Sequence, residues 1–434
     1  MSMYHLGSCS FNEVAYRRAK RGYITSWSVR VNYRIFLVTG QERKEMKITV
    51  VGGAGAMAKA VVKDLAESSG ISEVLLADIN ENAARQFAEE LRKRPEVKTK
   101  ISTVQIDVYD HERLVKVIKG SDAAIDTTHQ DCGVAVAKGV IDAKVNGCAL
   151  GSGHTIAREI LNFDKLTKEA GITYLVSAGV FPGATGITAK YLANKMDQVD
   201  DVHLSMVIFR PIALTPALAD LFITFLPGEG LTYENGALKK TPPFAGREEV
   251  EYPEPFGKQI IYNITSCDPL TIPLAIKGVK NVCVKATYYP DYTEMLRIFN
   301  DVGLLSTRPI KVNGKQVVPA EVLKELLIHR PVEKGREVVK FVQRVKVTGM
   351  KNGAKMECVV LMPFLPFKGE REDPETRATG EPGSIIVQML ARGDVKERGV
   401  MGPESCIDPE EFMREWAKRR GVAIHETCAV IRRI

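Results

Sequence analysis

The stretch MKITVVGGAGAMAKAVVKDLAESS, residues 46–69, carries the signals that decide the fold. Residues 47–51 are a short apolar run typical of a buried strand, and residues 56–69 have the apolar spacing of a helix. Gly70 follows this helix directly and predicts its end. The stretch therefore predicts a strand, a glycine-rich turn and a helix in immediate succession.

The turn has the pattern G-x-G-x-x-A, with Gly53, Gly55 and Ala58 at the fixed positions. In a dinucleotide-binding turn the first glycine permits the tight bend, the second lets a pyrophosphate approach the backbone, and a small third residue lets helix and strand approach each other. The helix N-terminus then supplies an anion site. The residues that we expect to contact the cofactor here are Gly53, Ala54, Gly55, Ala56 and Met57.

Asp78 ends the second predicted strand, EVLLAD, 25 residues after Gly53. A carboxylate at this place binds the adenosine ribose hydroxyls of NAD. Asp78 could instead be a turn or cap residue, although Asn80 is better placed to cap the next helix. No arginine immediately follows Asp78 to bind the 2′-phosphate of NADP, and Arg85 lies a turn or more into that helix. We therefore expect NAD to be preferred over NADP.

Strands and helices continue to alternate, which predicts a doubly wound parallel sheet of the Rossmann type. The further strands are TVQID, AAIDT, GCAL and ITYLVS, and the helices between them are HERLVKVIK, GVAVAKGVIDAK and EILNFDKLTKEA. Ligands bind at the carboxyl edge of such a sheet. At that edge we expect Asp107 and Val108 to flank the adenine, and the nicotinamide half to face Thr127, Thr128 and His129.

The stretch SAGVFPGATGITAKYLANK, residues 177–195, follows the sixth strand. Pro182 and Gly183 predict a stiff turn into a helix. We expect the free N–H groups of this helix to point at the cofactor or the substrate.

Beyond residue 199 the segments become longer and richer in β-formers, as in DVHLSMVIFR and FVQRVKVTG. This change predicts a second, α+β domain with a mixed or antiparallel sheet, in which YENG is a hairpin turn. Residues 376–404 have the spacing of a long helix that docks back on the first domain. The predicted parts are an extension outside the fold at 1–45, a Rossmann domain at 46–195, a substrate and dimerisation domain at 196–370, and a returning segment at 371–434.

The composition is that of a globular protein, with 45% hydrophobic and 26% charged residues and no apolar run near the roughly 18 residues of a membrane span. The net charge is +7, of which residues 1–45 carry +5 and the remaining 389 residues carry +2. A charge of +2 over these 389 residues does not indicate a nucleic-acid-binding surface. The Arg-rich residues 1–45 fit a transit peptide or, better, an upstream start codon before Met46. Eight scattered cysteines without CxxC spacing indicate reduced thiols rather than disulfides or a zinc site. We expect a cytoplasmic protein without a bound metal.

Five ordered motifs extend over most of the chain. They are VVGGAGAMA at 50–58, EAGITYLVSAGVFPG at 169–183, DPLTIP at 268–273, DVGLLS at 301–306, and RATGEPGS at 377–384 followed by ARGDVKERGVMGPE. Together they resemble the saccharopine dehydrogenase family, which includes saccharopine reductases, lysine 6-dehydrogenases, and carboxynorspermidine and homospermidine synthases. The resemblance implies a nicotinamide cofactor, hydride transfer at a carbon–nitrogen bond of an amino-acid substrate, and a homodimer. It also implies that the loop with Gly179, Pro182 and Gly183 lies beside the nicotinamide, so these residues are further candidate cofactor contacts.

Two stretches depart from the pattern of this family. CALGSG at 148–153 has Ala149 where many relatives have an acid, and DTTHQDCG at 126–133 replaces the usual apolar, proline-containing loop. Both departures fall on the face where we expect the substrate. The resemblance therefore implies the cofactor more firmly than the substrate.

Hydride transfer at an imine also needs a group that handles the proton on nitrogen and a cation that holds carboxylates. His129 and His154 follow strands at the carboxyl edge, so either could handle this proton. The alternative for each is a solvated or capping loop histidine. Asp131 could bind a substrate ammonium, although a helix cap is the stronger interpretation. Arg210 could bind a substrate carboxylate, with a surface salt bridge as the alternative.

These observations predict an NAD(P)-dependent oxidoreductase that acts on a primary or secondary amine of lysine or of a lysine-derived opine. A first alternative is a reductive condensing enzyme of polyamine synthesis, which joins an amine to an aldehyde and reduces the imine. A second is a non-catalytic dinucleotide-binding regulator, which Ala149 favours. The expected partner is a small amino-acid or amine substrate, with neither nucleic acid nor a membrane.

Overall fold

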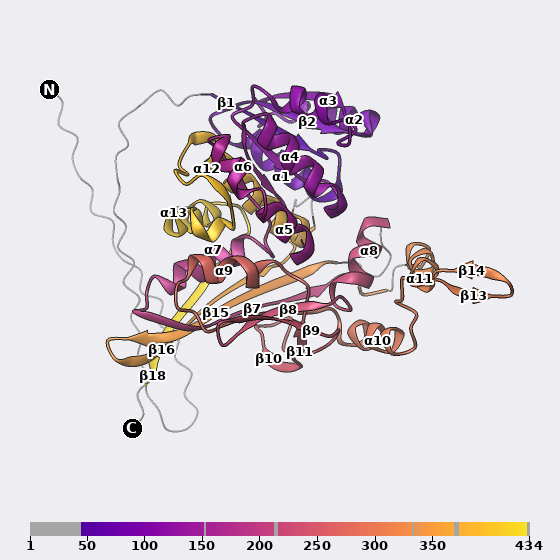
Figure 1. Cartoon of the computed structure of the whole chain (residues 1–434), viewed down its shortest axis with the longest axis vertical. Helices are drawn as coiled ribbons and strands as arrows, with labels where there is room; N and C mark the ends of the chain where they lie inside the picture. The colour runs from indigo at the N-terminus through magenta and orange to yellow at the C-terminus, as the bar shows by residue number, and fades with distance from the viewer. Residues whose placement is uncertain are drawn as a thin grey trace. The chain divides into compact units, whose positions relative to one another are not determined.

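The computed structural model describes residues 45–151, 153–211, 216–331, 334–336, 338–368 and 373–431. These residues belong to one compact unit, Lys44–Ile434, so the predicted domain boundaries at 195/196 and 370/371 lie inside it and stay predictions. The prediction for residues 1–45 lies outside the described residues except at Glu45. The described chain forms two large sheets covered by helices, which confirms the predicted α/β class (Figure 1).

The first sheet has seven parallel strands in the order β17-β6-β5-β4-β1-β2-β3. Its strands are β1 (Met46–Val51), β2 (Ile71–Asp78), β3 (Lys100–Gln105), β4 (Ala123–Asp126), β5 (Asn146–Ala149), β6 (Thr173–Leu175) and β17 (Gly399–Met401). The strand order reverses between β1 and β4, which is where a doubly wound sheet opens a ligand crevice at its carboxyl edge. The predicted Rossmann sheet is thus confirmed.

The helices that connect these strands have the apolar faces expected from the sequence. They are α1 (Ala56–Glu67), α2 (Glu81–Arg92), α3 (His111–Ile118), α4 (Gly133–Asp142), α5 (His154–Leu161), α6 (Asp164–Glu169) and α7 (Ala184–Ala193). In α1 the buried side chains include Val61 and Val62, which precede the buried Leu65 by four and three residues and lie on the same face. The side chain of Asn80 accepts a hydrogen bond from the Ala83 N–H group, so Asn80 caps α2 as expected.

The second sheet has nine strands and is mixed, because β7 and β12 pair in parallel while the other neighbours are antiparallel. Its strands are β7 (Gln198–Phe209), β8 (Gly230–Glu234), β9 (Ala237–Thr241), β10 (Glu248–Glu251), β11 (Lys258–Asn263), β12 (Asn281–Thr287), β15 (Lys340–Lys351), β16 (Ala354–Phe364) and β18 (His425–Ile431). Asn235 and Gly236 both have positive φ between β8 and β9. The predicted mixed sheet and its YENG hairpin are therefore confirmed.

Four helices and a small hairpin accompany the second sheet. They are α8 (Pro216–Phe225), α9 (Asp268–Ala275), α10 (Pro290–Asp301), α11 (Pro319–Ile328), and the pair β13 (Ile310–Val312) and β14 (Lys315–Val317). None of the helices within the described ranges combines the length and the apolar character that crossing a membrane requires.

The C-terminal part of the chain contributes to both sheets. It comprises α12 (Pro374–Arg392), β17, the 3₁₀ turn η2 (Pro403–Ser405), α13 (Pro409–Ala417) and β18. The long helix predicted over 376–404 ends at Arg392, because Gly393 takes a left-handed conformation there. The residues that follow add β17 to the first sheet, whereas β18 pairs with β16 at the edge of the second.

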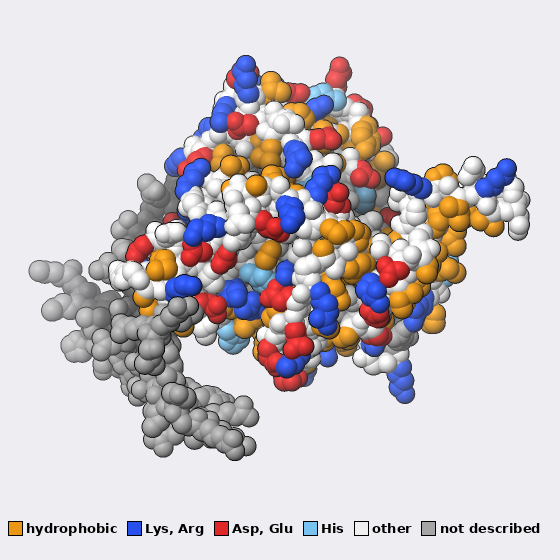
Figure 2. Space-filling model, turned by 60° about the horizontal axis from the view of Figure 1, so that its bottom comes forward, with side chains coloured by type: hydrophobic (Ala, Val, Ile, Leu, Met, Phe, Trp, Pro, Cys, Tyr) orange, Lys and Arg blue, Asp and Glu red, His pale blue; other side chains and the backbone are white. Residues whose placement is uncertain are grey.

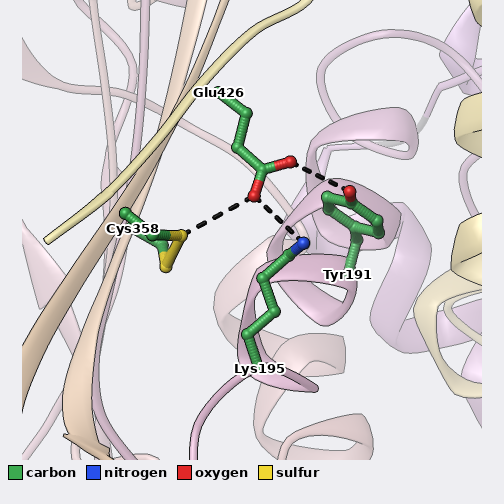
Figure 3. The surroundings of a disulfide bond; sticks show 5 residues. Tyr191, Lys195, Cys358 and Glu426 are labelled. Carbon is green, nitrogen blue, oxygen red and sulfur yellow. Dashed lines mark hydrogen bonds and ion pairs between the residues drawn. A yellow bond between two sulfur atoms is a disulfide. The ribbon is translucent and has the colours of Figure 1, made fainter. Parts of the chain in front are cut away.

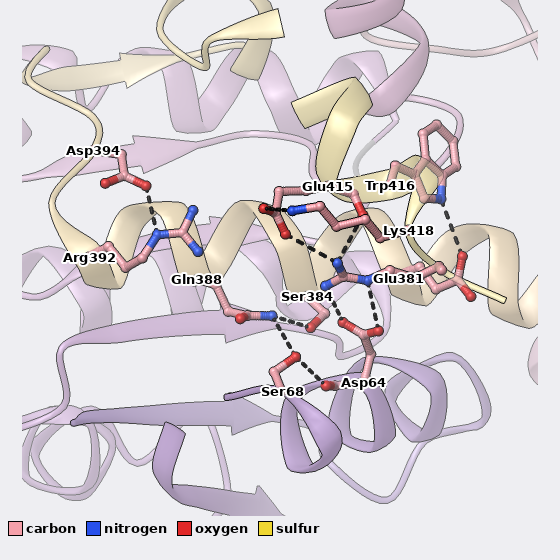
Figure 4. A network of polar contacts seen from close by, with 11 residues as sticks. Asp64, Ser68, Glu381, Ser384, Gln388, Arg392, Asp394, Glu415, Trp416 and Lys418 are labelled. Carbon is pink, nitrogen blue, oxygen red and sulfur yellow. Dashed lines mark hydrogen bonds and ion pairs between the residues drawn. The ribbon is translucent and has the colours of Figure 1, made fainter. Parts of the chain in front are cut away.

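Helix α12 packs closely against α1, as the gold and purple helices in Figure 1 show. A Cβ atom at Gly380 would lie 2.4 Å from the Cβ of Ala60, so only glycine allows this approach. Polar contacts surround the packed faces (Figure 4): Gln388 donates to Ser68 Oγ at 3.2 Å, and Trp416 of α13 donates to Glu381 at 3.2 Å. These contacts hold α12 against α1 and α13 against α12.

The prediction that the cysteines are reduced thiols is wrong for two of them. Cys358 in β16 and Cys428 in β18 form a disulfide between directly paired positions, with Cα atoms 4.1 Å apart. They are 70 residues apart in the chain, so only the pairing of β18 with β16 reveals that they meet. Beside them, Glu426 accepts a hydrogen bond from Tyr191 at 2.9 Å and forms an ion pair with Lys195 at 3.0 Å (Figure 3). Strand β18 is thus attached to β16 and to α7.

Candidate functional site

The glycine turn between β1 and α1 lies at the reversal of strand order. Gly52 is the residue with a left-handed φ, +79°, and a Cβ atom there would lie 3.0 Å from the Thr128 backbone nitrogen. The tight bend therefore falls on Gly52 and not, as predicted, on Gly53. A Cβ atom at Gly53 would instead lie 3.0 Å from the side chain of Leu76 in β2. Glycine at 53 is needed for packing against the neighbouring strand.

The N-terminus of α1 has the features of an anion site. Gly55 precedes the helix, and no side chain caps it. A Cβ atom at Gly55 would lie 3.2 Å from the Gly52 carbonyl oxygen, so a larger residue would crowd the turn. Ala58 is fully buried, whereas Ala56 and Met57 in the first turn are accessible. This cradle fits the pyrophosphate of a dinucleotide, which the uncapped N–H groups would hold.

Asp78 lies at the carboxyl end of β2 beside this cradle. Its carboxylate accepts hydrogen bonds from the Ala54 N–H group at 2.9 Å and from the Asn80 N–H group at 2.8 Å. The side chain is mostly buried but keeps acceptor capacity beyond these two bonds. Asp78 is therefore tied to the glycine turn, where the predicted ribose contact would be made.

The other predicted cofactor contacts after β3 and β4 lie at the same edge. Asp107 is exposed and accepts a hydrogen bond from the Tyr109 N–H group, and Val108 is half-buried. Thr127 donates its hydroxyl to the Val51 carbonyl at 2.7 Å, which ties the end of β4 to β1. Thr128 borders Gly52, as described above.

Asp126, the last residue of β4, is a buried acid that the sequence analysis did not single out. Its Oδ1 atom accepts hydrogen bonds from the N–H group and the hydroxyl of Thr128, at 2.9 and 2.7 Å. Burial raises the pKa of Asp126 to about 6, although the bonds from Thr128 oppose the rise. The sequence did contain a signal for Asp126, because it is an acid at the end of an otherwise apolar strand and so lies at the carboxyl edge of the sheet. Asp126 orders the loop that carries Thr127 and Thr128.

The loop after β6 is a tight turn that contains a cis peptide bond between Phe181 and Pro182. Gly183 has φ +127°, and a Cβ atom there would lie 2.5 Å from the Gly179 carbonyl oxygen. The N–H groups of Ala184 and Thr185 donate to the carbonyls of Gly179 and Val180. The expectation that these N–H groups are free for a ligand is therefore wrong, because the turn itself uses them.

Two of the four predicted catalytic residues form an exposed pair. His129 Nδ1 lies 3.2 Å from the Asp131 carboxylate, and about half or more of each side chain is exposed. Asp131 does not cap a helix, since the cap of the short turn that follows is His129 and α4 has no side-chain cap. Both residues lie between the end of β4 and the start of α4.

Arg210, at the end of β7, is buried rather than at the surface. Its Nη1 atom forms an ion pair with Glu375 of α12 at 2.9 Å, and both side chains are less than a tenth exposed. Because Glu375 already pairs with this guanidinium, removing either partner would leave a buried charge unpaired, which is costly. The ion pair joins β7 to the C-terminal helix.

His154 lies between the carboxyl edge of the first sheet and loops of the second sheet. It is the first residue of α5, after β5, and its Nδ1 atom is hydrogen-bonded to Thr265 Oγ1 at 2.9 Å in the loop after β11. Its Nε2 atom lies 4.0 Å from Glu229 Oε1 in the turn before β8, and only 11% of the imidazole is exposed. Burial lowers the pKa of His154; Glu229 opposes this shift, and Arg158 and Lys240 add to it.

The loop after β4 connects His154 with the glycine turn. A Cβ atom at Gly153 would lie 3.2 Å from Gln130 Oε1, two residues after the Thr128 that borders Gly52. The cradle and His154 therefore share one edge of the first sheet. An imidazole at this edge, oriented by the Thr265 hydroxyl, can take up a proton beside a ligand when it is neutral and can deliver one when it is protonated.

Two further features bear on the predicted partners. Acidic and basic side chains are interspersed over the described residues of the face in Figure 2, without a broad basic stripe on that face. No group of three or more His, Cys, Asp or Glu within the described ranges is arranged to hold a metal ion.

Family models match two parts of the chain. Residues 48–175 match the saccharopine dehydrogenase NADP binding domain, and residues 227–422 match the saccharopine dehydrogenase C-terminal domain. The first match includes β2 to β6 and His154, and the second includes most strands of the second sheet, whereas β7 and β18 lie outside both.

Similar proteins align over nearly their whole lengths. The carboxynorspermidine synthase of Vibrio cholerae is 24% identical over 390 residues, which cover 83% of this chain and 92% of that protein. The carboxyaminopropylagmatine dehydrogenase of Synechocystis is 21% identical over 398 residues, which cover 88% and 97%. The apo saccharopine dehydrogenase (L-Glu forming) of Saccharomyces cerevisiae has the same fold, with a TM-score of 0.66 at 15% identity, covering 88% of this chain and 100% of that one.

Proposed function

Because the chain belongs to the saccharopine dehydrogenase family and is an NAD(P)-dependent oxidoreductase, we propose that it reduces an imine, formed from an amine and an aldehyde, to a secondary amine. The observation that carries this proposal is the similarity, over nine-tenths of their lengths, to proteins named carboxynorspermidine synthase and carboxyaminopropylagmatine dehydrogenase. It corresponds to the polyamine alternative of the sequence analysis. Lysine or a lysine-derived opine is the second candidate substrate.

The chemistry requires a proton as well as a hydride. The amine adds to the aldehyde carbonyl, water leaves, and a carbon–nitrogen double bond forms. A bound nicotinamide dinucleotide supplies the hydride to the imine carbon. His154 donates a proton to the nitrogen, which makes the neighbouring carbon a better hydride acceptor, and regains a proton from solvent. Thr265 holds the imidazole ring in place at 2.9 Å.

The preference for NAD over NADP is also part of the proposal. Asp78 supports it, because its carboxylate can accept hydrogen bonds from ribose hydroxyls and would repel a 2′-phosphate. The description of the matching family model names NADP, so this choice depends on Asp78 alone.

A cytoplasmic homodimer completes the proposal. Exposed apolar side chains directly after α10 and on α11 support the dimer, with Val302 71% and Leu326 63% exposed. Hydrophobic side chains also gather on the arm at the right of Figure 2, where Figure 1 places these helices. Light scattering of the purified protein measures the number of subunits.

The assay follows the absorbance of the reduced nicotinamide. The purified protein is incubated with either reduced cofactor and a diamine plus aspartate semialdehyde. We expect the absorbance to fall only when amine and aldehyde are both present. Turnover of lysine or saccharopine alone, with the oxidised cofactor, would select the second candidate. Tight cofactor binding without turnover of any amine, opine or semialdehyde would indicate a regulator and contradict the proposal.

A further inference from the structure

We propose that Glu229 binds the distal ammonium group of a diamine substrate and that Lys240 occupies this ammonium site in the free protein. The inference rests on the proposed function and adds the subsite that would recognise the amine. It concerns a carboxylate beside His154 that the sequence analysis did not single out.

The geometry places one carboxylate oxygen between an ammonium and the imidazole. Glu229 Oε1 lies 2.8 Å from the ammonium nitrogen of Lys240 and 4.0 Å from Nε2 of His154. A cation bound to this oxygen therefore lies next to the group that handles the proton. Glu229 is 49% exposed, so a ligand can reach its carboxylate.

The backbone on both sides of Glu229 is closely packed. Glu229 stands between Gly228 and Gly230, where the backbone passes so closely that a Cβ atom would lie within 2.5 Å of Thr224 or Thr241. Lys240 reaches it only through a long side chain that is 66% exposed. Exposed ion pairs hold weakly, so a substrate ammonium can displace that of Lys240 without rearrangement of the backbone.

His154 does not compete for Glu229 as a cation. Burial lowers the pKa of the imidazole, and the charges of Arg158 and Lys240 lower it further, against the effect of Glu229 itself. At neutral pH the imidazole is therefore mostly uncharged. The carboxylate remains available for an ammonium group.

A different use of the same pair would give the opposite result for Lys240. If Glu229 and Lys240 together bound the two charges of an α-amino acid, Lys240 would contribute to binding. In our proposal Lys240 is a competitor, so its removal strengthens binding of a diamine. The sign of this effect separates the two possibilities.

The experiment measures binding by calorimetry to the protein saturated with oxidised cofactor, where no reduction can occur. The probes are 1,3-diaminopropane and propylamine, which differ by one ammonium group. We expect the wild type to bind the diamine about tenfold more tightly, as one charge-assisted hydrogen bond predicts. Glu229→Gln should bring this ratio near one, and Lys240→Met should raise the affinity for the diamine several-fold.

A neighbouring pair on the same hairpin provides the matched control. Glu234 and Lys239 lie 3.0 Å apart with similar exposure, and no contact with His154 is involved. Glu234→Gln and Lys239→Met should leave both affinities unchanged.

Three results would overturn the proposal: a wild type without preference for the diamine, a Glu229→Gln variant that keeps the preference, or weaker diamine binding by Lys240→Met. The subsite alone would be rejected if the wild type reduces the imine but the Glu229→Gln variant still binds the diamine more tightly than propylamine. The predicted binding pattern without any imine reduction would reject the proposed reaction alone.

Discussion

His154 stands where a loop of the first sheet meets loops of the second, and its partners there are Thr265 and Glu229. Because general acids contribute roughly 10² to 10⁴ in rate, we expect His154→Ala to lower kcat by that factor. The Kd of the cofactor should not change, since the cradle lies at Gly52 to Met57. Stopped-flow reduction and cofactor titration measure the two quantities. If the His154→Ala variant has the same kcat as the wild type, His154 does not take part in catalysis.

The pH profile of kcat provides a second test at the same residue. Reduction needs the protonated imidazole, and burial lowers the pKa of His154 below its usual 6.5. The rate should therefore fall as pH rises through a pKa below 6.5, and this limb should disappear in His154→Ala. Thr265→Val keeps the imidazole but loses its orienting bond, so a smaller loss of rate is expected.

Asp78 is the residue on which cofactor choice depends. A hydrogen bond to a charged group contributes about 1.5 to 3 kcal/mol, so Asp78→Ala should narrow the preference for NAD about ten- to a hundredfold. Asp78→Asn is the control for the turn, because an amide oxygen can still accept from the Ala54 N–H group. The ratio of kcat/KM for the two cofactors decides the point. A preference of the wild type for NADP would contradict the predicted contact between Asp78 and the ribose hydroxyls.

Among the elements, β18 is attached in the most unusual way, by a disulfide to β16 and by Glu426 to α7. A disulfide typically contributes about 2 to 4 kcal/mol to the free energy of unfolding. Cys428→Ser should therefore lower the free energy of unfolding by that amount in denaturant titrations. A reducing agent should have the same effect on the wild type and none on the variant. A wild type that is indifferent to reduction would contradict the bridge.

The elements also show which parts of the fold the sequence could predict. The strand, turn and helix at 46–69 have local signals, since their apolar periods and glycines lie within one stretch. β17 has three residues and pairs with β6, far away in the chain, so no local pattern predicts it. The same applies to the disulfide and to Thr265 beside His154, because both depend on contacts between distant segments. The position of Arg210 at a strand end made it a candidate for binding a carboxylate. Only the structure shows that it forms an ion pair with Glu375.

At the scale of the whole molecule, buried acids link segments from different parts of the chain. A Cβ atom at Gly186 of α7 would lie 2.7 Å from a carboxylate oxygen of Glu404 in η2, which shows how closely the two pack. Burial raises the pKa of Glu404 to about 7; Thr271 opposes the shift, and Asp268 of α9 adds to it. Burial likewise raises the pKa of Asp268 to about 6.

These shifts predict how stability depends on pH. The folded pKa of Glu404 lies above its unfolded value of 4.5, so the protonated acid stabilises the fold fully below pH 4.5, and this contribution is lost as pH rises through about 7. The side chain of the Glu404→Gln variant cannot ionise. Between pH 5 and pH 8 the free energy of unfolding should therefore decrease by roughly 1 to 3 kcal/mol less in this variant than in the wild type. Melting curves at both pH values measure the difference. Equal losses in the two proteins would contradict a buried, protonated Glu404.

The transfer of a hydride to an imine carbon is the central claim, and isotope labelling tests it directly. The protein is incubated with a diamine, aspartate semialdehyde and reduced cofactor that carries deuterium in both positions at C4 of the nicotinamide, so that a deuteride is transferred from either face. The account predicts a secondary amine that carries one deuterium, on the carbon bonded to the new nitrogen, as mass spectrometry of the product can show. A secondary amine without deuterium, or oxidation of the cofactor without this product, would contradict the account.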